Sequence, residues 1–290
     1  WNQSNIDTGD FYCLTVMDNT VIAGSHSRKG LFYSEDNGKT WYKSDIMSGD
    51  FSCLTVIDNI VIAGSYSNNG LFYSEDKGKT WKDSNINIGY FRCLTVIGSI
   101  VIAGSLSGKG LLYSEDKGKT WNQSNIDTDD FSSLTVIDNI VIAGSNYVNG
   151  LYYSEDNGKT WKQSNVTIGD FWCLTVIDDT VIAGSNFNKG LYYSKNKGKK
   201  WKKSNIKNNN FICLTTSGNT IIAGSYSNNG LFYSEDKGKT WNQSNIDVGD
   251  FVCLTTIGNT VIAGSYVRNK CKGLLYSEDN GKTWKESNID

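Results

Sequence analysis

The fold is decided by the stretch Ser34-Glu35-Asp36-Asn37-Gly38-Lys39-Thr40-Trp41, because the chain contains it many times. The pattern S-x-D-x-G-x-T-W returns at 74–81, 114–121, 154–161, 234–241 and 277–284. A degenerate copy at 194–201 has lost its Asp and its Thr. Seven copies in 290 residues indicate a protein built from one small unit, repeated along the chain.

The repeat is 40 residues long, and tryptophan marks it. Trp recurs at 1, 41, 81, 121, 161, 201 and 241, then at 284 after a three-residue insertion. The units run 11–50, 51–90, 91–130, 131–170, 171–210, 211–250 and 251–290, and residues 1–10 are an extra copy of a unit's last quarter. Since no linker or change of composition separates the units, we expect 1–290 to form a single domain.

Each unit reads as four short strands. In the second unit these are 51–57, 60–64, 71–74 and 80–84, and Asp58-Asn59 forms a two-residue hairpin turn between the first two. None of them shows the apolar spacing of a helix. Four antiparallel strands per 40-residue unit predict an all-β, seven-bladed β-propeller. A β-solenoid is the competing fold, but its coils are usually shorter and lack regular hairpins. Either 1–5 or 284–288 could supply the fourth strand of the closing blade.

The repeated string resembles the Asp-box, or BNR, repeat family. This family includes sialidases, sortilin-type receptors, photosystem II assembly factors and glycan-active or glycan-binding propellers. The chemistry of the string is that of a turn: Asp accepts backbone N–H groups two residues on, and Gly38 supplies a positive φ. Ser34 and Thr40 bond across the turn, and Trp41 buries its ring between blades. We therefore expect a structural role for the aspartates of the intact copies: Asp36, Asp76, Asp116, Asp156, Asp236 and Asp279.

The sialidases of this family imply an arginine triad, a Tyr–Glu nucleophile pair, an acid Asp and an Arg-Ile-Pro signature. This chain has no proline and only three arginines, Arg28, Arg92 and Arg268. No Glu or Tyr stands apart from the repeat pattern as a nucleophile. The single histidine, His26, excludes Ser-His-Asp and multi-histidine metal arrangements. We expect no catalytic residues, metal or cofactor, and keep a sialidase-like glycan hydrolase as the alternative.

Charge and cysteines bear on partners and compartment. The net charge of −2 comes from 28 basic and 30 acidic residues, so the chain as a whole has no charge footprint for nucleic acid. No apolar run is long enough for a membrane span. The chain starts at Trp1, and no targeting segment is visible in it.

Six cysteines share one repeat position, the third residue of the first strand, and Ser133 fills that position once: Cys13, Cys53, Cys93, Cys173, Cys213 and Cys253. Symmetry-related neighbours should lie beyond the roughly 7 Å that a disulfide spans. We expect small buried side chains at a tight contact between blades; a thiol ring that takes a soft metal or reacts in redox chemistry is the alternative. Unpaired thiols favour a reducing compartment, whereas the family resemblance favours an extracellular one. Cys271, in the inserted loop, is expected to be exposed.

The units differ at three places: the second residue of the first strand, the loop between strands two and three, and the connection between blades. In an antiparallel blade all three lie at one end, whereas the hairpin turns and the repeated string lie at the other. Aromatic rings beside amides suit a glycan or protein ligand. The candidate ligand-binding residues are Tyr12, His26, Arg28, Tyr66, Asn68, Arg92, Tyr147, Trp172, Phe187, Tyr226, Tyr266 and Arg268. Neutral drift of these loops, or a purely structural scaffold, remains open.

Overall fold

The computed structural model describes residues 4–6, 10–26, 28–147, 149–206, 209–226, 228–266 and 273–287. Candidate Arg268 and Cys271 lie outside these residues. The seven repeats, called blades from here on, fall into two compact units of the chain. The first compact unit is 1–141 with 154–161, the second is 142–153 with 162–290, and each is described by itself.

The described residues form strands and turns, and no helix occurs among them. The first strands of the blades are β1 (Phe11–Met17), β5 (Phe51–Ile57), β9 (Phe91–Ile97), β13 (Phe131–Ile137), β17 (Asp170–Ile177), β21 (Phe211–Ser217) and β25 (Asp250–Ile257). The second strands are β2 (Thr20–Ser25), β6 (Ile60–Ser65), β10 (Ile100–Ser105), β14 (Ile140–Ser145), β18 (Thr180–Asn186), β22 (Thr220–Ser225) and β26 (Thr260–Tyr266). The third strands are β3 (Leu31–Ser34), β7 (Leu71–Ser74), β11 (Leu111–Ser114), β15 (Leu151–Ser154), β19 (Gly190–Ser194), β23 (Leu231–Ser234) and β27 (Leu274–Ser277). The fourth strands are β4 (Tyr42–Lys43), β8 (Lys82–Asp83), β12 (Asn122–Gln123), β16 (Lys162–Gln163), β20 (Lys202–Lys203), β24 (Asn242–Gln243) and β28 (Lys285–Glu286).

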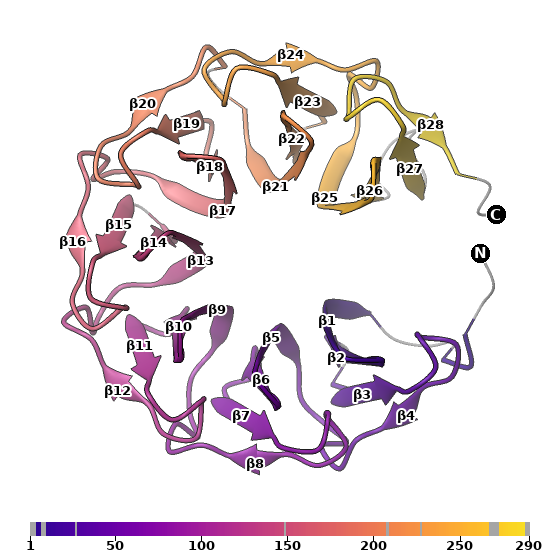
Figure 1. The fold of residues 1–290 in the computed structure, drawn as a ribbon, viewed down its shortest axis with the longest axis vertical. Coiled ribbons are helices and arrows are strands. Elements are labelled where there is room, and N and C mark those ends of the chain that lie inside the picture. The colour runs from indigo at the N-terminus through magenta and orange to yellow at the C-terminus, as the bar shows by residue number, and fades with distance from the viewer. Residues whose placement is uncertain are drawn as a thin grey trace. The chain divides into compact units, whose positions relative to one another are not determined.

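Consecutive strands pair in sequence order and give seven four-stranded sheets, so the chain is a seven-bladed β-propeller, as predicted (Figure 1). In the last sheet β28 pairs with β27, so the C-terminal copy supplies that fourth strand. The fourth strands are shorter than predicted. In blade two, Thr80 is bound to the turn and the Trp81 N–H bonds to the preceding blade, which leaves only Lys82 and Asp83 to pair with β7.

The second strand of each inner blade lies in the middle of its sheet, and both of its faces are covered. In β6, Val61 packs in a cluster with Met17 and Ile22 of blade one, whereas Ile62 packs in a cluster with Phe91 of blade three. All six residues of β6 are buried. Packing on both sides explains why this strand is apolar throughout and does not alternate.

Glycine and cysteine let neighbouring blades approach closely. A Cβ on Gly64 would lie 2.4 Å from Cys53 Sγ and 2.9 Å from the Cβ of Phe91 in the next blade. The Cys53 thiol donates to the Phe91 carbonyl at 3.4 Å, and burial raises the pKa of that thiol to about 12. The predicted burial holds for Cys53, Cys93, Cys173 and Cys213.

Cys253 is exposed and Cys13 is partly exposed, so the prediction of burial fails at Cys253. β25 belongs to the last blade, and no later blade of its own unit packs on this face. For the matching reason Leu14 of β1, the first blade, is exposed, whereas its equivalent Leu54 packs against blade one.

An asparagine after the fourth strand joins each of blades two to six to the next one, and in blade one Asp45 takes its place and accepts the Trp81 N–H. Asn85 Nδ2 donates to the Trp121 carbonyl at 3.0 Å, and the Trp121 N–H donates to Asn85 Oδ1 at 2.8 Å. Asn5 makes the same pair of bonds with Trp41, so the extra N-terminal copy gives blade one this contact. The pair recurs at Asn125–Trp161, Asn165–Trp201, Asn205–Trp241 and Asn245–Trp284.

Candidate functional site

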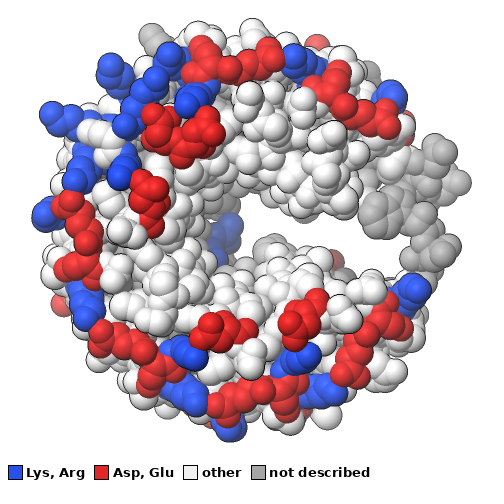
Figure 2. Space-filling model, in the orientation of Figure 1, with Lys and Arg blue, Asp and Glu red and all other residues white. Residues whose placement is uncertain are grey.

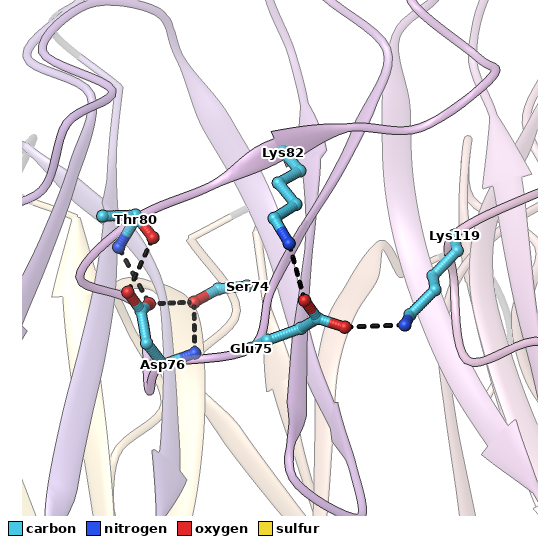
Figure 3. A network of polar contacts seen from close by, with 6 residues as sticks. All are labelled: Ser74, Glu75, Asp76, Thr80, Lys82 and Lys119. Atoms are coloured by element: carbon cyan, nitrogen blue, oxygen red, sulfur yellow. Dashed lines mark hydrogen bonds and ion pairs between the residues drawn. The ribbon is translucent and has the colours of Figure 1, made fainter.

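Each blade has two chemically different ends. At the uniform end, the side chains of the repeated string close their own turn (Figure 3). Asp76 Oδ1 accepts the Thr80 N–H at 2.9 Å and the Ser74 hydroxyl at 2.8 Å, and Oδ2 accepts the Thr80 hydroxyl at 2.6 Å. The prediction that the aspartate accepts the N–H two residues further along the chain is wrong. The N–H that Asp76 accepts is that of Thr80, four residues further along. The reason is that Lys77 and Gly78 both have positive φ, 62° and 84°, which curls the chain back over the carboxylate.

These hydrogen bonds keep the aspartates ionised. Burial by itself would raise the pKa of Asp76, but the bonds from Thr80 and Ser74 outweigh it and the pKa is lowered. At Asp36 the bonds from the Thr40 hydroxyl and N–H lower the pKa to about 2. A carboxyl group with so low a pKa is a poor general acid at neutral pH. The structural role expected for these aspartates agrees with this geometry.

Charge pairs connect the uniform ends of adjacent blades. Glu75 accepts Lys82 of its own blade at 2.7 Å and Lys119 of the next blade at 2.6 Å, and these two bonds lower its pKa to about 2 (Figure 3). The inter-blade pair recurs at Glu35–Lys79, Glu115–Lys159 and Glu235–Lys282. On the face drawn in Figure 2, acidic and basic side chains accordingly lie side by side along the outer parts of the blades.

The opposite end, which we call the varied end, is held by main-chain bonds and by the side chain of the residue that precedes the first strand. The Tyr66 N–H donates to the carbonyl of Asp50, the residue before β5, at 2.7 Å. Asp50 Oδ1 also accepts the N–H of Arg28, from the strand 2–3 loop of blade one, at 2.7 Å. Its own N–H donates to Ser67 Oγ at 3.0 Å. The loops and the inter-blade connection therefore lie together, as expected from the strand order.

Aromatic rings from blades one and two meet at the varied end of the first compact unit. The centroid of Tyr12, in β1, lies 4.3 Å from that of His26, which lies 5.8 Å from Tyr66 of blade two. Tyr66 in turn lies 6.1 Å from Tyr90, the residue before β9, in an edge-on contact. We call these four residues the aromatic track. Tyr12 is 56% exposed and Tyr90 39%, whereas His26 and Tyr66 are half-buried.

Tyr90 is the member of the track that the candidate set missed. A signal was present in the sequence, because the residue before the first strand is Asp or Asn in every other repeat. Its backbone keeps the shared role: the Leu106 N–H donates to the Tyr90 carbonyl at 2.8 Å. The side chain is therefore released from accepting a loop N–H, and it contacts Tyr66 instead.

The other described candidates of the first compact unit lie near the same end of their blades. Arg28 and Asn68 are exposed loop residues, and Arg92 is half-buried on β9. Arg28 has a φ of 56°, where the equivalent residues are Asn68, Gly108, Asn188 and Asn228. Left-handed backbone is uncommon for an arginine, and such strain is often found at functional loops.

The remaining described candidates belong to the second compact unit, residues 142–153 and 162–290. Phe187 is 64% exposed and Tyr147 63%, each at a positive φ, 57° and 71°. Trp172 is half-buried, and its Nε1 donates to Asp170 Oδ1 at 2.8 Å. Tyr226 and Tyr266 occupy the repeat position of Tyr66 and are exposed.

Groups for hydrolysis or metal binding do not gather at this end. All seven glutamates of the sequence lie in the repeated strings or, for Glu286, in a fourth strand, so none lies in a varied loop. Within the described ranges, no group of three or more His, Cys, Asp or Glu side chains is placed to hold a metal ion. Nor does any helix there have the length and apolarity to cross a membrane.

Four-stranded blades, each with a turn centred on Asp or, in blade five, on Asn196, define a repeat-built β-propeller. Three of the repeats match the family model described as BNR/Asp-box repeat, at residues 32–43, 152–163 and 275–286. A comparison with curated protein sequences gives no significant match.

Solved structures share the fold at low identity. The computationally designed Ika8 protein has a TM-score of 0.70 at 14% identity, covering 88% of this chain and 80% of that one. Catalytically inactive virginiamycin B lyase from Staphylococcus aureus, with quinupristin, has a TM-score of 0.70 at 18% identity, covering 91% and 94%. YCF48 bound to D1 peptide has a TM-score of 0.66 at 17% identity, covering 93% and 91%. These likenesses concern the fold alone.

Proposed function

We propose that this chain is a non-enzymatic binding propeller that recognises a glycan or a peptide at its varied end. The aromatic track is the observation that carries the proposal. Tyr12, His26, Tyr66 and Tyr90 come from two adjacent blades, yet they form one series of ring contacts at the end where the repeats differ. Flat rings beside hydrogen-bonding loop groups suit pyranose faces and the side chains of extended peptides.

The track is built on a firm support. The His26 N–H donates to the Asp10 carbonyl at 2.7 Å, just as the Tyr66 N–H donates to the Asp50 carbonyl. The main chain behind each ring is thus fixed before a ligand arrives, which reduces the entropy lost on binding. Binding of a D1 peptide by YCF48, a propeller of similar fold, supports a peptide as one of the two ligand classes.

The glutamates support the non-enzymatic part of the proposal. A retaining or inverting glycosidase uses a pair of carboxyl groups that flank the scissile bond. In this chain the glutamates lie away from the varied loops. Asp50 at the varied end accepts the Arg28 N–H, so its carboxylate already has a structural role.

Glycan and peptide arrays, followed by calorimetry on the best ligand, test the proposal. We expect Tyr12→Ala and Tyr66→Ala each to weaken binding at least tenfold, which corresponds to about 1.4 kcal/mol or more and is usual for an aromatic side chain at the centre of a binding site. Tyr42→Ala is the matched control, because Tyr42 is a similarly exposed tyrosine on a fourth strand, stacked on Tyr33 at 5.5 Å. It should change the affinity less than twofold.

Three results would contradict the proposal. Saturable binding that Tyr12→Ala and Tyr66→Ala leave intact would show that the aromatic track is not part of the binding site. Arrays in which no ligand binds saturably would show that neither a glycan nor a peptide is the ligand. Turnover of 4-methylumbelliferyl glycosides that is lost in Arg28→Ala would show a hydrolase instead.

A further inference from the structure

The degenerate string of blade five differs from all the others in charge. Residues 194–203 contain six lysines and no acidic residue, a net charge of +6, whereas the equivalent segment of every other blade has a net charge of 0 or −1. We call these side chains the lysine edge: Lys195, Lys197, Lys199, Lys200, Lys202 and Lys203.

The turn itself does not require these lysines, because it keeps the geometry of the intact copies. Asn196 Oδ1 takes the place of the aspartate oxygen, accepting the Ser194 hydroxyl at 2.9 Å and the Lys200 N–H at 2.8 Å. Trp201 Nε1 donates to the Gly198 carbonyl at 2.7 Å, as in the other blades. The charge has therefore changed while the backbone has not.

The substitutions also remove a stabilising contact between blades. In the same unit, Glu235 of blade six accepts Lys282 of blade seven at 2.6 Å. In blade five the position of that glutamate is Lys195, and the position of its partner in blade six is Lys239. Two ammonium groups thus occupy the positions of an ion pair, an arrangement that disfavours the fold unless an anion lies between them.

The lysines are presented to solvent. Five of the six are exposed, and Lys199 is half-buried with its ammonium 5.9 Å from the Tyr153 ring. Figure 2 shows basic side chains gathered over β19 and β20, at the upper left, where the other blades alternate acidic and basic groups. This surface lies at the uniform end and outer strand of blade five, apart from the varied end of that blade.

We infer that the lysine edge binds a linear polyanionic polysaccharide, one that carries sulfate or carboxylate groups along its length. Compact ammonium groups on long stems suit repeated single charges, whereas phosphate recognition favours the bidentate fork of arginine, which this segment lacks. Trp201 is buried, so no exposed aromatic ring in the segment offers the base stacking used by binders of single-stranded nucleic acid. No large exposed apolar side chain there could enter a bilayer.

A fluorescent heparin oligosaccharide, titrated by anisotropy at 50 and 150 mM salt, tests the inference. We expect saturable binding to the unaltered protein that weakens with salt. The triple variant Lys195→Gln, Lys200→Thr and Lys202→Gln should weaken it at least tenfold, since Thr at 200 restores the residue of the intact string. The matched control, Lys39→Gln with Lys77→Gln and Lys117→Gln, removes the same charge from other blades and should change binding less than threefold.

Melting temperatures are measured for both variants to check that they are folded. If heparin binding weakens equally in the two variants, it depends on the net charge of the protein and not on the lysine edge, which would overturn the inference. Absence of heparin binding at 50 mM salt would overturn it as well. Tighter binding of single-stranded DNA or of phosphatidylserine vesicles than of heparin would replace the polysaccharide by those ligands. Tyr66→Ala should leave heparin binding unchanged. Failure of the lysine-edge proposal can therefore be told apart from failure of the proposed function of the varied end.

Discussion

The two ends of a blade differ in which groups make the hydrogen bonds that hold them. At the uniform end the side chains make the hydrogen bonds of the fold, as Asp76 does with Thr80 and Ser74. At the varied end the main chain makes many of them, as in the bond from the Tyr66 N–H to the Asp50 carbonyl. The side chain that also takes part there, that of Asp50, belongs to a position that is Asp or Asn in all repeats but one. Where side chains hold the turn, the repeats agree in sequence, and where the main chain holds it, they diverge. Divergence at the varied end therefore costs the fold little, which is the condition for a binding surface to evolve there.

The largest effect expected from this comparison concerns the buried tryptophan of the string. Trp121 is 4% exposed and packs in a cluster with Ile57 and Ile62 of the preceding blade. Trp121→Ala should lower the free energy of unfolding by about 3–5 kcal/mol, because it leaves a large cavity between blades. Tyr147→Ala, which removes a ring of the varied end, should change it by less than about 0.5 kcal/mol. Chemical denaturation measures both, and equal losses would mean that the varied end also supports the fold.

A smaller loss is expected from the aspartate of the turn. Asp76→Ala removes the acceptor of three hydrogen bonds and should cost about 1.5–3 kcal/mol. Asp76→Asn should cost clearly less, because Asn196 shows that an amide oxygen keeps the bonds from the N–H and from the serine. If the two substitutions are equally harmful in thermal denaturation, the bond from the Thr80 hydroxyl would be the decisive one.

Acid should weaken the hydrogen bonds of the uniform end. The folded pKa of Asp36, about 2, lies below the ordinary value of 3.8, and the pKa values of the other intact-string aspartates are also lowered. A lowered folded pKa means that these groups stabilise the fold fully above about pH 5 and lose this contribution as the pH falls from about 4 to about 2. Melting temperatures should drop in that window, and the Asp76→Asn variant should show a smaller drop. A pH profile unchanged by Asp76→Asn would contradict this account.

Much of the fold follows from the sequence because the repeat supplies seven parallel observations of one blade. The strand limits of 51–57 and 71–74 agree with β5 and β7, since turn residues bound them. The two-residue β8 is shorter than predicted because Trp81 bonds to another blade, a contact that no local pattern contains. Cys253 is likewise exposed through its place in the last blade, although its local sequence matches the buried copies.

The candidate site was less accessible to sequence reasoning. Grouping by repeat position placed Tyr12, His26 and Tyr66 at one end, but the ring contacts between blades depend on loop geometry. Tyr90 was overlooked because its position is a polar acceptor elsewhere and reads as a connection. The contribution of Arg268 stays a prediction, since it lies outside the described residues.

The smallest expected effect tests whether the varied end retains strain. Arg28 holds a φ of 56° at a position where three other blades have asparagine with φ between 56° and 63°. Asparagine tolerates this backbone better than arginine, so Arg28→Asn should raise the free energy of unfolding by a few tenths to about 1 kcal/mol. The exchange Asn68→Arg should lower it by a similar amount, measured in the same denaturation series. If Arg28→Asn also weakens binding of the ligand found by the arrays, the strain at Arg28 is retained for the ligand; if binding is unchanged, the loop of blade one has drifted without a function.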